Sequence, residues 1–373
     1  MAGNRIPVLQ LIKCLDRGGA EQLMAAMVIH GDRSRFHYEV AFVRSEMRGL
    51  VGELEAAGIP VHDLGAGRDL DLAWMLRLRR LLARRRFAVM HAHLPYAAGL
   101  GRLVARTIPA ARRPRLVYTE HSLWPHNPLP IRCLGLATSR WDDVGIAVSH
   151  SNHAALPAVI RSRTQVILHG VDRDGIRRAA AEPRDIRAEL DIARGHVVVV
   201  SVANLRAQKG YPTLLRAARA MVDAGLPVTF LAVGTGRQQT ELLAEHRQLE
   251  LGERFRFLGQ RADALSLLAS SDVLVLASDY ECMPVVVMEA LALGTPVVAT
   301  AVGDLPAVIE DDVTGVLVPP GRPDLLAAAL RRLVLEPDVR ERLARAAQAS
   351  AERFDVRRAS SDVESVYARL ASS

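Results

Sequence analysis

Lysine is almost absent from this chain. Only Lys13 and Lys209 occur among 373 residues, so its 48 basic residues are nearly all arginine. Cysteine is also scarce, since Cys14, Cys133 and Cys282 lie far apart and form no C-x-x-C pair. This pattern excludes a disulfide-stapled domain and argues against a zinc ribbon or an iron–sulfur cluster. It fits a reduced, cytoplasmic compartment.

Aromatic residues and long apolar runs are missing too. Phe, Trp and Tyr make up 4% of the chain, and no base-stacking motif accompanies the arginines, so nucleic acid is not expected as a partner. No run of 18 apolar residues occurs, and the first ten residues lack the apolar core of a signal peptide. We therefore expect a protein kept in the cytoplasm, or at the inner face of the cell membrane.

The charge that is present divides the chain in two. Residues 1–172 contain 23 Lys and Arg against 14 Asp and Glu, whereas residues 173–373 contain 25 against 27. Hydrophobic residues make up 50% of the chain, which excludes a disordered protein and predicts a full-sized core. The basic first part and the nearly neutral second part are expected to meet different partners.

Short apolar runs alternate with helical patterns, which predicts an α/β fold. Buried parallel strands are continuous Val, Ile and Leu runs, because helices cover both faces of the sheet. The runs in the first part are Val8–Ile12, Glu39–Val43, Val89–His91, Leu116–Thr119, Ile146–Val148 and Val166–Leu168. After a polar connector at 172–191 they are Val197–Val202, Val228–Val233, Arg254–Leu258, Val273–Ala277 and Pro296–Thr300. Two series predict two doubly wound, Rossmann-like domains facing across a cleft.

The predicted domains cover residues 1–172 and 173–355. Residues 356–373 form a further helix, because Val363, Val366 and Tyr367 recur at helical spacing as one apolar stripe. Such a stripe must pack against another element. We expect this last helix to pack back toward the N-terminal domain.

The stretch from Ser278 to Gly294 carries the most chemistry. It follows a buried strand and begins a helix near Pro284, so free backbone N–H groups point out of the turn, as at phosphate sites. A helix cap and a surface residue are the plain interpretations of Glu281 and Glu289. However, Glu289 is embedded between apolar segments, where an unpaired carboxylate is costly. A polar ligand such as a ribose diol explains it better.

Two other turns have phosphate-binding chemistry. Arg206 and Lys209 follow the strand Val197–Val202, and each charge-assisted hydrogen bond to a diphosphate contributes about 1.5–3 kcal/mol. An exposed basic pair is the equally weighted alternative. Gly18 and Gly19 permit a tight turn before a helix. That turn is neither G-x-G-x-x-G nor a Walker A sequence, which weakens NAD and P-loop interpretations.

Taken together, the motifs resemble retaining GT-B glycosyltransferases of family 4, the glycosyl transferases group 1. The motifs are E-x7-E at 281–289 with a proline inside, A-L-G-T-P-V-V-A-T, G-V-L-V-P-P-G, R-x-x-K-G at 206–210, G-G-A-E at 18–21, H-A-H at 91–93, T-E-H-S at 119–122 and H-G-V-D at 169–172. They span nearly the whole chain. The resemblance implies an acceptor-binding N-terminal domain and a C-terminal domain that binds a nucleotide-sugar donor.

The resemblance also implies a role for each site residue. Arg206 and Lys209 would neutralise the leaving diphosphate, Glu281 would bind a hydroxyl of the sugar, and Glu289 would bind the ribose. Gly18, Gly19 and the backbone of Cys282, Met283 and Pro284 would line the donor. His121 would lie beside the anomeric centre. The implied catalytic residues are His121, Arg206, Lys209 and Glu281.

The implied reaction is front-face transfer, with retention, of a hexose-type sugar from a UDP- or GDP-linked donor. The acceptor is a glycan or a lipid-linked molecule of cell-envelope or exopolysaccharide biosynthesis. A departing phosphate oxygen deprotonates the acceptor, so no metal and no other cofactor is expected.

Two alternatives belong to other functional classes. One is a nucleotide-sugar 2-epimerase of the same fold, and the other is a nucleotide-sugar-binding protein without turnover. Cys282 stands where the family usually has glycine, and His169 where it usually has asparagine. These departures keep the inactive alternative open, although neither removes a charged ligand of the phosphates or the ribose. Cys282 would be strained in a backbone with positive φ.

Two features have both a metal interpretation and a plainer one. Asp69-Leu70-Asp71 is a D-x-D sequence, but capping of the helical run that follows explains it more simply than a metal does. His91 and His93 share one face of a strand and could bind zinc, but no third ligand is placed nearby, and histidines of a core or an acceptor pocket are the commoner case.

The arginines of residues 77–86 supply much of the basic charge. Arg77, Arg80 and Arg84 lie on the helix face opposite the leucines. Solvation alone explains such a face. Contact with an anionic membrane surface that holds the acceptor is the sharper hypothesis.

Overall fold

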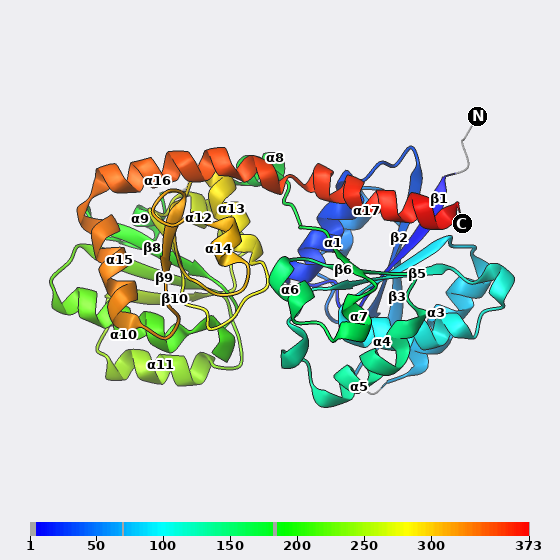
Figure 1. Cartoon of the computed structure of the whole chain (residues 1–373). Helices are drawn as coiled ribbons and strands as arrows, with labels where there is room; N and C mark the ends of the chain where they lie inside the picture. The colour runs from blue at the N-terminus through cyan, green and yellow to red at the C-terminus, as the bar shows by residue number, and fades with distance from the viewer. Residues whose placement is uncertain (1–4, 69–70, 182–184, 373) are drawn as a thin grey trace. The chain divides into compact units, whose positions relative to one another are not determined.

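The chain divides into two compact units, each built on its own parallel sheet (Figure 1). The computed structural model describes residues 5–68, 71–181 and 185–372. Unit 1 contains Met1–Gly170 and Phe354–Ser373, and unit 2 contains Val171–Arg353. Both divisions lie two residues before the boundaries placed from the sequence. Gly170 and Asp355, which both belong to unit 1, are in close contact, since a Cβ on Gly170 would lie 2.4 Å from the Asp355 carbonyl.

Unit 1 has its described strands in the order β3-β2-β1-β4-β5-β6-β7. The strands are β1 (Ile6–Ile12), β2 (Phe36–Arg44), β3 (Val61–Ala66), β4 (Val89–His93), β5 (Arg115–Glu120), β6 (Val144–Ala147) and β7 (Thr164–Val166). The helices are α1 (Gly19–His30), α2 (Val51–Ala56), α3 (Ala73–Arg84), α4 (Pro95–Arg106), α5 (Leu129–Thr138), α6 (His150–Ala154), α7 (Ala158–Arg161) and α17 (Val356–Ala371). All paired strands are parallel, as in a doubly wound fold.

Unit 2 has its described strands in the order β10-β9-β8-β11-β12-β13, again all parallel. The strands are β8 (Val197–Val202), β9 (Val228–Val233), β10 (Phe255–Gly259), β11 (Val273–Leu276), β12 (Val297–Thr300) and β13 (Gly315–Val318). The helices are α8 (Arg173–Ala180), α9 (Ile186–Glu189), α10 (Tyr211–Asp223), α11 (Gln239–Gln248), α12 (Ala264–Ala269), α13 (Val285–Leu293), α14 (Leu305–Val308), α15 (Pro323–Leu335) and α16 (Pro337–Ser350). The predicted α/β class with two doubly wound sheets is confirmed.

Alternation along β1 shows how helices cover both faces of the first sheet. Val8 and Ile12 belong to one buried cluster, to which α1 and α17 contribute. Leu9 and Leu11 belong to another, together with Trp74 of α3 and side chains of α4. The two faces are therefore both apolar, which is why the strands appear in the sequence as unbroken hydrophobic runs.

The sequence patterns missed four of the described elements, two strands and two helices. β3 and β13 are edge strands; polar residues and a glycine interrupt the apolar pattern of β3, and β13 has only four residues, the first of which is a glycine. The polar connector at 172–191 contains α8 and α9. α8 packs against α12 and α13, and Ile176 supplies its buried contact. One buried side chain per two turns is too weak a signal for a helix prediction.

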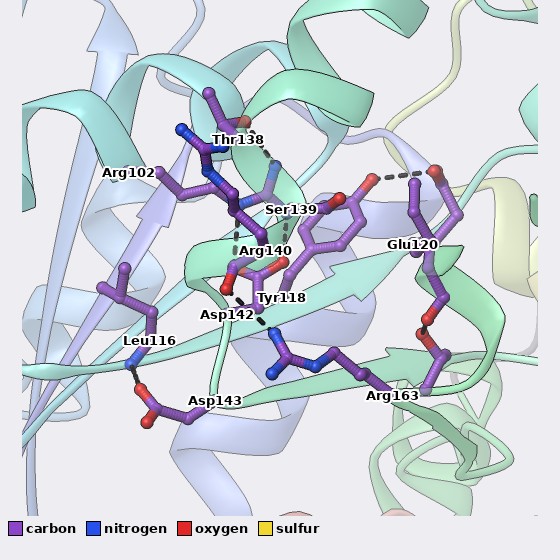
Figure 2. A network of polar contacts seen from close by, with 12 residues as sticks. Arg102, Leu116, Tyr118, Glu120, Thr138, Ser139, Arg140, Asp142, Asp143 and Arg163 are labelled. Carbon is purple, nitrogen blue, oxygen red and sulfur yellow. Dashed lines mark hydrogen bonds and ion pairs between the residues drawn. The ribbon is translucent and has the colours of Figure 1, made fainter.

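A buried polar network ties α4 and α5 to the sheet of unit 1 (Figure 2). Arg102 forms a two-point ion pair with Asp142, at 2.7 and 2.5 Å, and also donates to Thr138. Burial raises the pKa of Asp142 to about 6, although Arg102 opposes this shift. Because a lone charge in this core is costly, the two partners depend on each other.

The last helix packs on unit 1. α17 lies against α1 and buries Val363, Val366 and Tyr367, the stripe that the sequence indicated. Its Glu364 accepts hydrogen bonds from the Tyr38 hydroxyl at 2.7 Å and from the Asp32 backbone at 2.6 Å. Among the described residues no helix is long and apolar enough to cross a membrane.

Candidate functional site

The strand order of unit 2 reverses between β8 and β11. The chain proceeds from β8 to β9 on one side and from β11 to β12 on the other, and ligands of doubly wound sheets bind beyond the carboxyl ends at such a point. The loops after β8 and β11 touch there. Gly210 has φ +61°, and a Cβ on it would lie 1.9 Å from the Ala277 carbonyl oxygen. Only glycine fits this contact.

Lys209 and Glu281 meet at this point. Lys209 lies at the end of a 3₁₀ turn after β8, Glu281 follows β11, and Nζ is 2.5 Å from Oε1. Their side chains are 16% and 7% exposed, so the pair is largely shielded from water. Ser278 donates to the same carboxylate oxygen at 2.7 Å. The structure thus joins two residues to which the resemblance gave separate roles.

Arg206 is exposed beside this pair. No described residue forms a hydrogen bond or ion pair with its guanidinium, so its charge is available to a ligand. Its charge lies close enough to Tyr280 to affect the pKa of that phenol. Burial and the Glu281 charge raise the pKa of the Tyr280 phenol, while Arg206 opposes the shift.

The N-terminus of α13 lies at the same strand-to-loop turn. Pro284 precedes its first residue and no side chain caps it, which leaves first-turn N–H groups for a ligand. Met283 and Pro284 are buried. The Cys282 carbonyl accepts from Asp304 N at 3.2 Å, so the adjacent loop already occupies that oxygen. Cys282 is not among the described residues with positive φ, and the expected backbone strain is absent there.

Glu289 is the fifth residue of α13, and every other residue of this helix is apolar. Burial raises the pKa of its carboxyl to about 7, and no described residue forms a hydrogen bond or ion pair with it. The structure therefore agrees with the expectation from the sequence that this carboxylate lies among apolar residues without a polar partner from the described residues. A ligand that donates hydrogen bonds to Glu289 would remove the cost of burying it unpaired.

Gly18 and Gly19 lie in unit 1, at the start of α1. Gly18 precedes the helix and makes no side-chain cap. The carboxylate of Glu21 folds back over it, because Oε2 is 2.3 Å from the place of a Cβ on Gly18. In this structure the helix N-terminus is therefore faced by a carboxylate of its own first turn.

His121 follows β5 in unit 1. The turn that carries it is held by Glu120, which accepts from the Tyr118 hydroxyl at 2.8 Å (Figure 2). Glu120 also accepts from Ser122 N at 3.0 Å. His121 contacts His93, with 2.9 Å between Nε2 and Nδ1, and its ring stacks on His169 at 5.1 Å. Burial lowers the pKa of His121 well below its usual value, so the imidazole is neutral at pH 7.

The sequence patterns missed two partners of these histidines. Gln10 and Tyr367 are both buried and hydrogen-bonded to each other. Gln10 also bonds to His93, and the Tyr367 hydroxyl bonds to His91, which precedes His93 by two residues on β4. Gln10 left a signal, as a polar residue inside the apolar run of β1. Tyr367 left none, because it fits the apolar stripe of its helix.

Two segments had a metal interpretation, His91 with His93 and the D-x-D sequence at 69–71. Within the described residues, no group of three His, Cys, Asp or Glu side chains could hold a metal ion, and His91 and His93 are bonded to neutral partners instead. Asp69 and Leu70 lie outside the described residues. Asp71 Oδ1 accepts from Ala73 N at 3.0 Å at the start of α3, although the N-cap residue of this helix is Leu72 and no side chain caps it.

Family models match most of the chain. Residues 182–350 match the model described as glycosyl transferases group 1, and residues 17–174 match glycosyltransferase family 4. The two matches fall within unit 2 and largely within unit 1, respectively.

Curated relatives and solved structures agree with these matches. The D-inositol 3-phosphate glycosyltransferase of Saccharomonospora viridis is 34% identical over 57% of this chain, and the aligned region is 51% of that protein's length. The alpha-D-kanosaminyltransferase of Streptomyces kanamyceticus is 27% identical over 82% of this chain and 84% of that protein. The fold matches Anabaena HepE, solved with UDP and glucose, at a TM-score of 0.84, with 24% identity over 98% of this chain and 100% of that one.

Proposed function

Because this chain belongs to family 4 of the GT-B glycosyltransferases, the glycosyl transferases group 1, we propose that it transfers a hexose-type sugar from a nucleoside-diphosphate sugar to a lipid-linked or glycan acceptor. One observation carries the proposal. An unpaired Arg206, a shielded Lys209 and the uncapped start of α13 meet at the switch point of the second sheet. Cations beside a helix N-terminus suit a diphosphate better than any neutral ligand.

The donor site follows from the charges. The diphosphate of a nucleotide-sugar carries two negative charges, and Arg206 and Lys209 supply two positive ones. Glu289 would accept hydrogen bonds from the ribose diol, and Glu281 from a sugar hydroxyl while it orients Lys209. We propose UDP as the nucleotide. The similar fold of HepE, which was solved with UDP and with UDP-glucose, supports this choice over GDP.

The proposed reaction is front-face transfer with retention. The bond from the anomeric carbon to the β-phosphate oxygen breaks, and the acceptor oxygen bonds to the same face of that carbon. The acceptor proton passes to the departing phosphate oxygen. Arg206 and Lys209 stabilise the charge that develops there, so this proposal requires neither a metal nor another cofactor. His121 would lie beside the anomeric carbon.

The acceptor is assigned to unit 1, which holds most of the net positive charge. We propose a glycan or lipid-linked acceptor of cell-envelope or exopolysaccharide biosynthesis, reached from the cytoplasmic face of the membrane. α3 supports contact with a membrane surface. On this helix Arg80 and Arg84 are exposed, and Leu76, one turn before Arg80, is 60% exposed. The opposite face of the helix is buried through Trp74 and Leu78.

Vesicle binding tests this contact. Replacing Arg77, Arg80 and Arg84 with Gln should weaken binding to anionic vesicles roughly a hundredfold, because each arginine near such a surface contributes about 1 kcal/mol. Co-sedimentation at several lipid concentrations measures the change. The matched control replaces three exposed arginines of unit 2, Arg194, Arg247 and Arg331, with Gln. Equal binding by both triple variants would mean that the face of α3 is simply solvated.

A ligand panel tests the function itself. Thermal unfolding is followed with UDP, GDP, ADP and their sugars, each with and without Mg²⁺. A ligand at a hundred times its Kd stabilises the folded state by about 2.7 kcal/mol. We expect a selective shift with uridine nucleotides that does not depend on Mg²⁺. No shift with any nucleotide would contradict the donor site.

Product analysis then separates the alternatives. Sugar transfer that requires an acceptor supports the transferase. Isomerised donor without acceptor would indicate an epimerase, and tight nucleotide binding without any chemistry would indicate a binding protein.

A further inference from the structure

A cavity of about 380 Å³ lies in unit 1 at the amino ends of β5 and β6. The end of α4, the start of β5 and the turn before β6 supply its lining, with Arg106, Arg113, Arg115, Trp141 and Asp143 as the polar and aromatic side chains. His121 follows the carboxyl end of β5. The cavity is therefore at the opposite edge of the sheet from the histidines, and its volume is in the range of sites for small organic molecules.

The lining of this cavity is basic. Arg106, Arg113 and Arg115 bring three positive charges, and Asp143 is the one acidic residue among the described residues of the lining. Both oxygens of its carboxylate are already occupied. Oδ1 accepts from Arg115 at 3.2 Å, and Oδ2 accepts from the Leu116 N–H at 2.7 Å, a bond that Figure 2 shows. The lining therefore keeps an excess of two positive charges.

The other two arginines of the lining have N–H donors left for a ligand. Arg113 donates through Nε to the Ala105 carbonyl at 3.2 Å and through Nη2 to the Ile108 carbonyl at 3.0 Å. These bonds satisfy carbonyls at the negative end of the α4 dipole, and Nη1 bonds to no described residue. Arg106 has no hydrogen bond or ion pair with a described residue. Its guanidinium lies 5.7 Å from the centre of the Trp141 ring, and this cation–π contact uses none of its N–H groups.

We propose that the cavity binds a phosphate monoester, with its phosphate on Arg106 and Arg113 and its organic part beside Trp141. A phosphate monoester carries a charge of about −1.5 to −2 at pH 7, which matches the excess of two positive charges. A carboxylate or a sulfate ester carries a single charge and would leave the other unbalanced. Guanidinium groups bind phosphate oxygens through paired N–H donors. Soluble sugar phosphates and the headgroups of anionic phospholipids both have this chemistry.

Calorimetry with glucose 6-phosphate measures the binding. Arg106→Gln should raise the Kd by roughly tenfold to hundredfold, because it removes charge-assisted hydrogen bonds to the phosphate. Arg140→Gln is the matched control. Arg140 is also exposed and also lies over the Trp141 ring, at 5.3 Å, but it does not line the cavity. It should change the Kd by about twofold at most, because salt screens exposed charges that do not contact the ligand.

Both variants should fold like the wild type. Neither guanidinium forms a hydrogen bond or an ion pair with a described residue, so no bond within the protein is lost. Thermal unfolding without ligand checks this point.

The indole signals of the full chain show where the ligand binds. The chain has three tryptophans, and Trp74 and Trp124 are buried elsewhere in unit 1. In the ¹⁵N-tryptophan-labelled protein, the ligand should shift the Trp141 N–H signal, which is assigned by its loss in Trp141→Phe. Lys209→Met should bind glucose 6-phosphate as the wild type does. Loss of binding in that variant would place the phosphate on the loops of unit 2 and overturn the proposal.

Vesicles distinguish the two sources of the phosphate. Binding to phosphatidylcholine vesicles that contain phosphatidic acid is compared for the wild type, Arg106→Gln and Arg140→Gln. Weaker vesicle binding by Arg106→Gln alone identifies a lipid headgroup. Weaker glucose 6-phosphate binding with unchanged vesicle binding identifies a soluble phosphate. Both results support the site.

Equal affinity of the wild type and Arg106→Gln for both probes overturns the proposal, as does the absence of binding to either probe. A Trp141 signal that does not move when the probe binds also overturns it. None of these measurements uses sugar transfer. They therefore test the cavity whether or not the proposed function is correct.

Discussion

Replacing Lys209 with Met should lower the rate of sugar transfer by roughly 10²–10³-fold, the loss typical for removing one preorganised charge from a transition state. The ammonium is shielded from water, and Glu281 and Ser278 fix its position. It therefore needs no reorganisation when charge develops on the departing diphosphate. Arg206 remains in this variant, so donor binding should weaken less than kcat. Steady-state rates at saturating donor measure the effect.

Lys209→Met also leaves the buried carboxylate of Glu281 without its cation. A further variant must therefore distinguish a role of Lys209 in catalysis from a role in neutralising Glu281. The double variant Lys209→Met, Glu281→Gln removes both charges. If Lys209 only neutralised Glu281, the double variant should be faster than the single one. A diphosphate role predicts that it is no faster. Arg216→Met removes an exposed cation of α10 that pairs with Glu245 of α11, and it controls for loss of positive charge from unit 2.

Glu289→Gln should remove a pH dependence of donor binding. Burial raises the pKa of Glu289 to about 7, so the carboxylate that accepts from a ribose diol is mostly protonated at pH 6. If only the ionised form binds well, wild-type affinity at pH 6 is about tenfold below that at pH 8. Glu289→Gln should bind weakly and equally at both pH values. Calorimetry with an intact nucleotide-sugar is suitable, because its diphosphate diester does not titrate in this range.

The raised pKa of Glu289 also predicts how the stability of the fold depends on pH. Donor binding should improve as the pH rises, whereas the stability should fall. The folded state of unit 2 binds a proton below pH 7, whereas unfolded Glu289 binds one only near its usual pKa of 4.5. The stabilisation is thus fully present below pH 4.5 and is lost as pH rises through 7. Glu289→Gln should therefore exceed the wild type in stability at pH 8, by up to roughly 3 kcal/mol, and match it near pH 4.5.

Chemical unfolding at the two pH values measures this difference. Glu253→Gln changes a carboxylate that is 84% exposed, and it should leave both stability and donor affinity unaltered. Equal pH dependence of donor affinity in Glu289→Gln and the wild type would show that another group titrates in the site.

Local sequence determined the elements that are buried on both faces. The runs Val197–Val202 and Val228–Val233 are β8 and β9 without a shift, because central parallel strands need continuous apolar residues. Glu289 was recognisable for a similar reason, since its apolar neighbours on α13 place it in a buried helix. Edge strands such as β3 have one neighbour only, tolerate polar residues, and leave no comparable pattern.

Tertiary structure alone decided which of these groups meet. Lys209 and Glu281 are 72 positions apart and form a pair because β8 and β11 are adjacent at the switch point of their sheet. Gln10 and Tyr367 are 357 positions apart and meet because α17 covers the face of β1 on which Gln10 lies. Residue type and spacing specify what a side chain does chemically. The protonation state and tautomer depend on burial and on the partner's geometry, and these exist only in the folded chain.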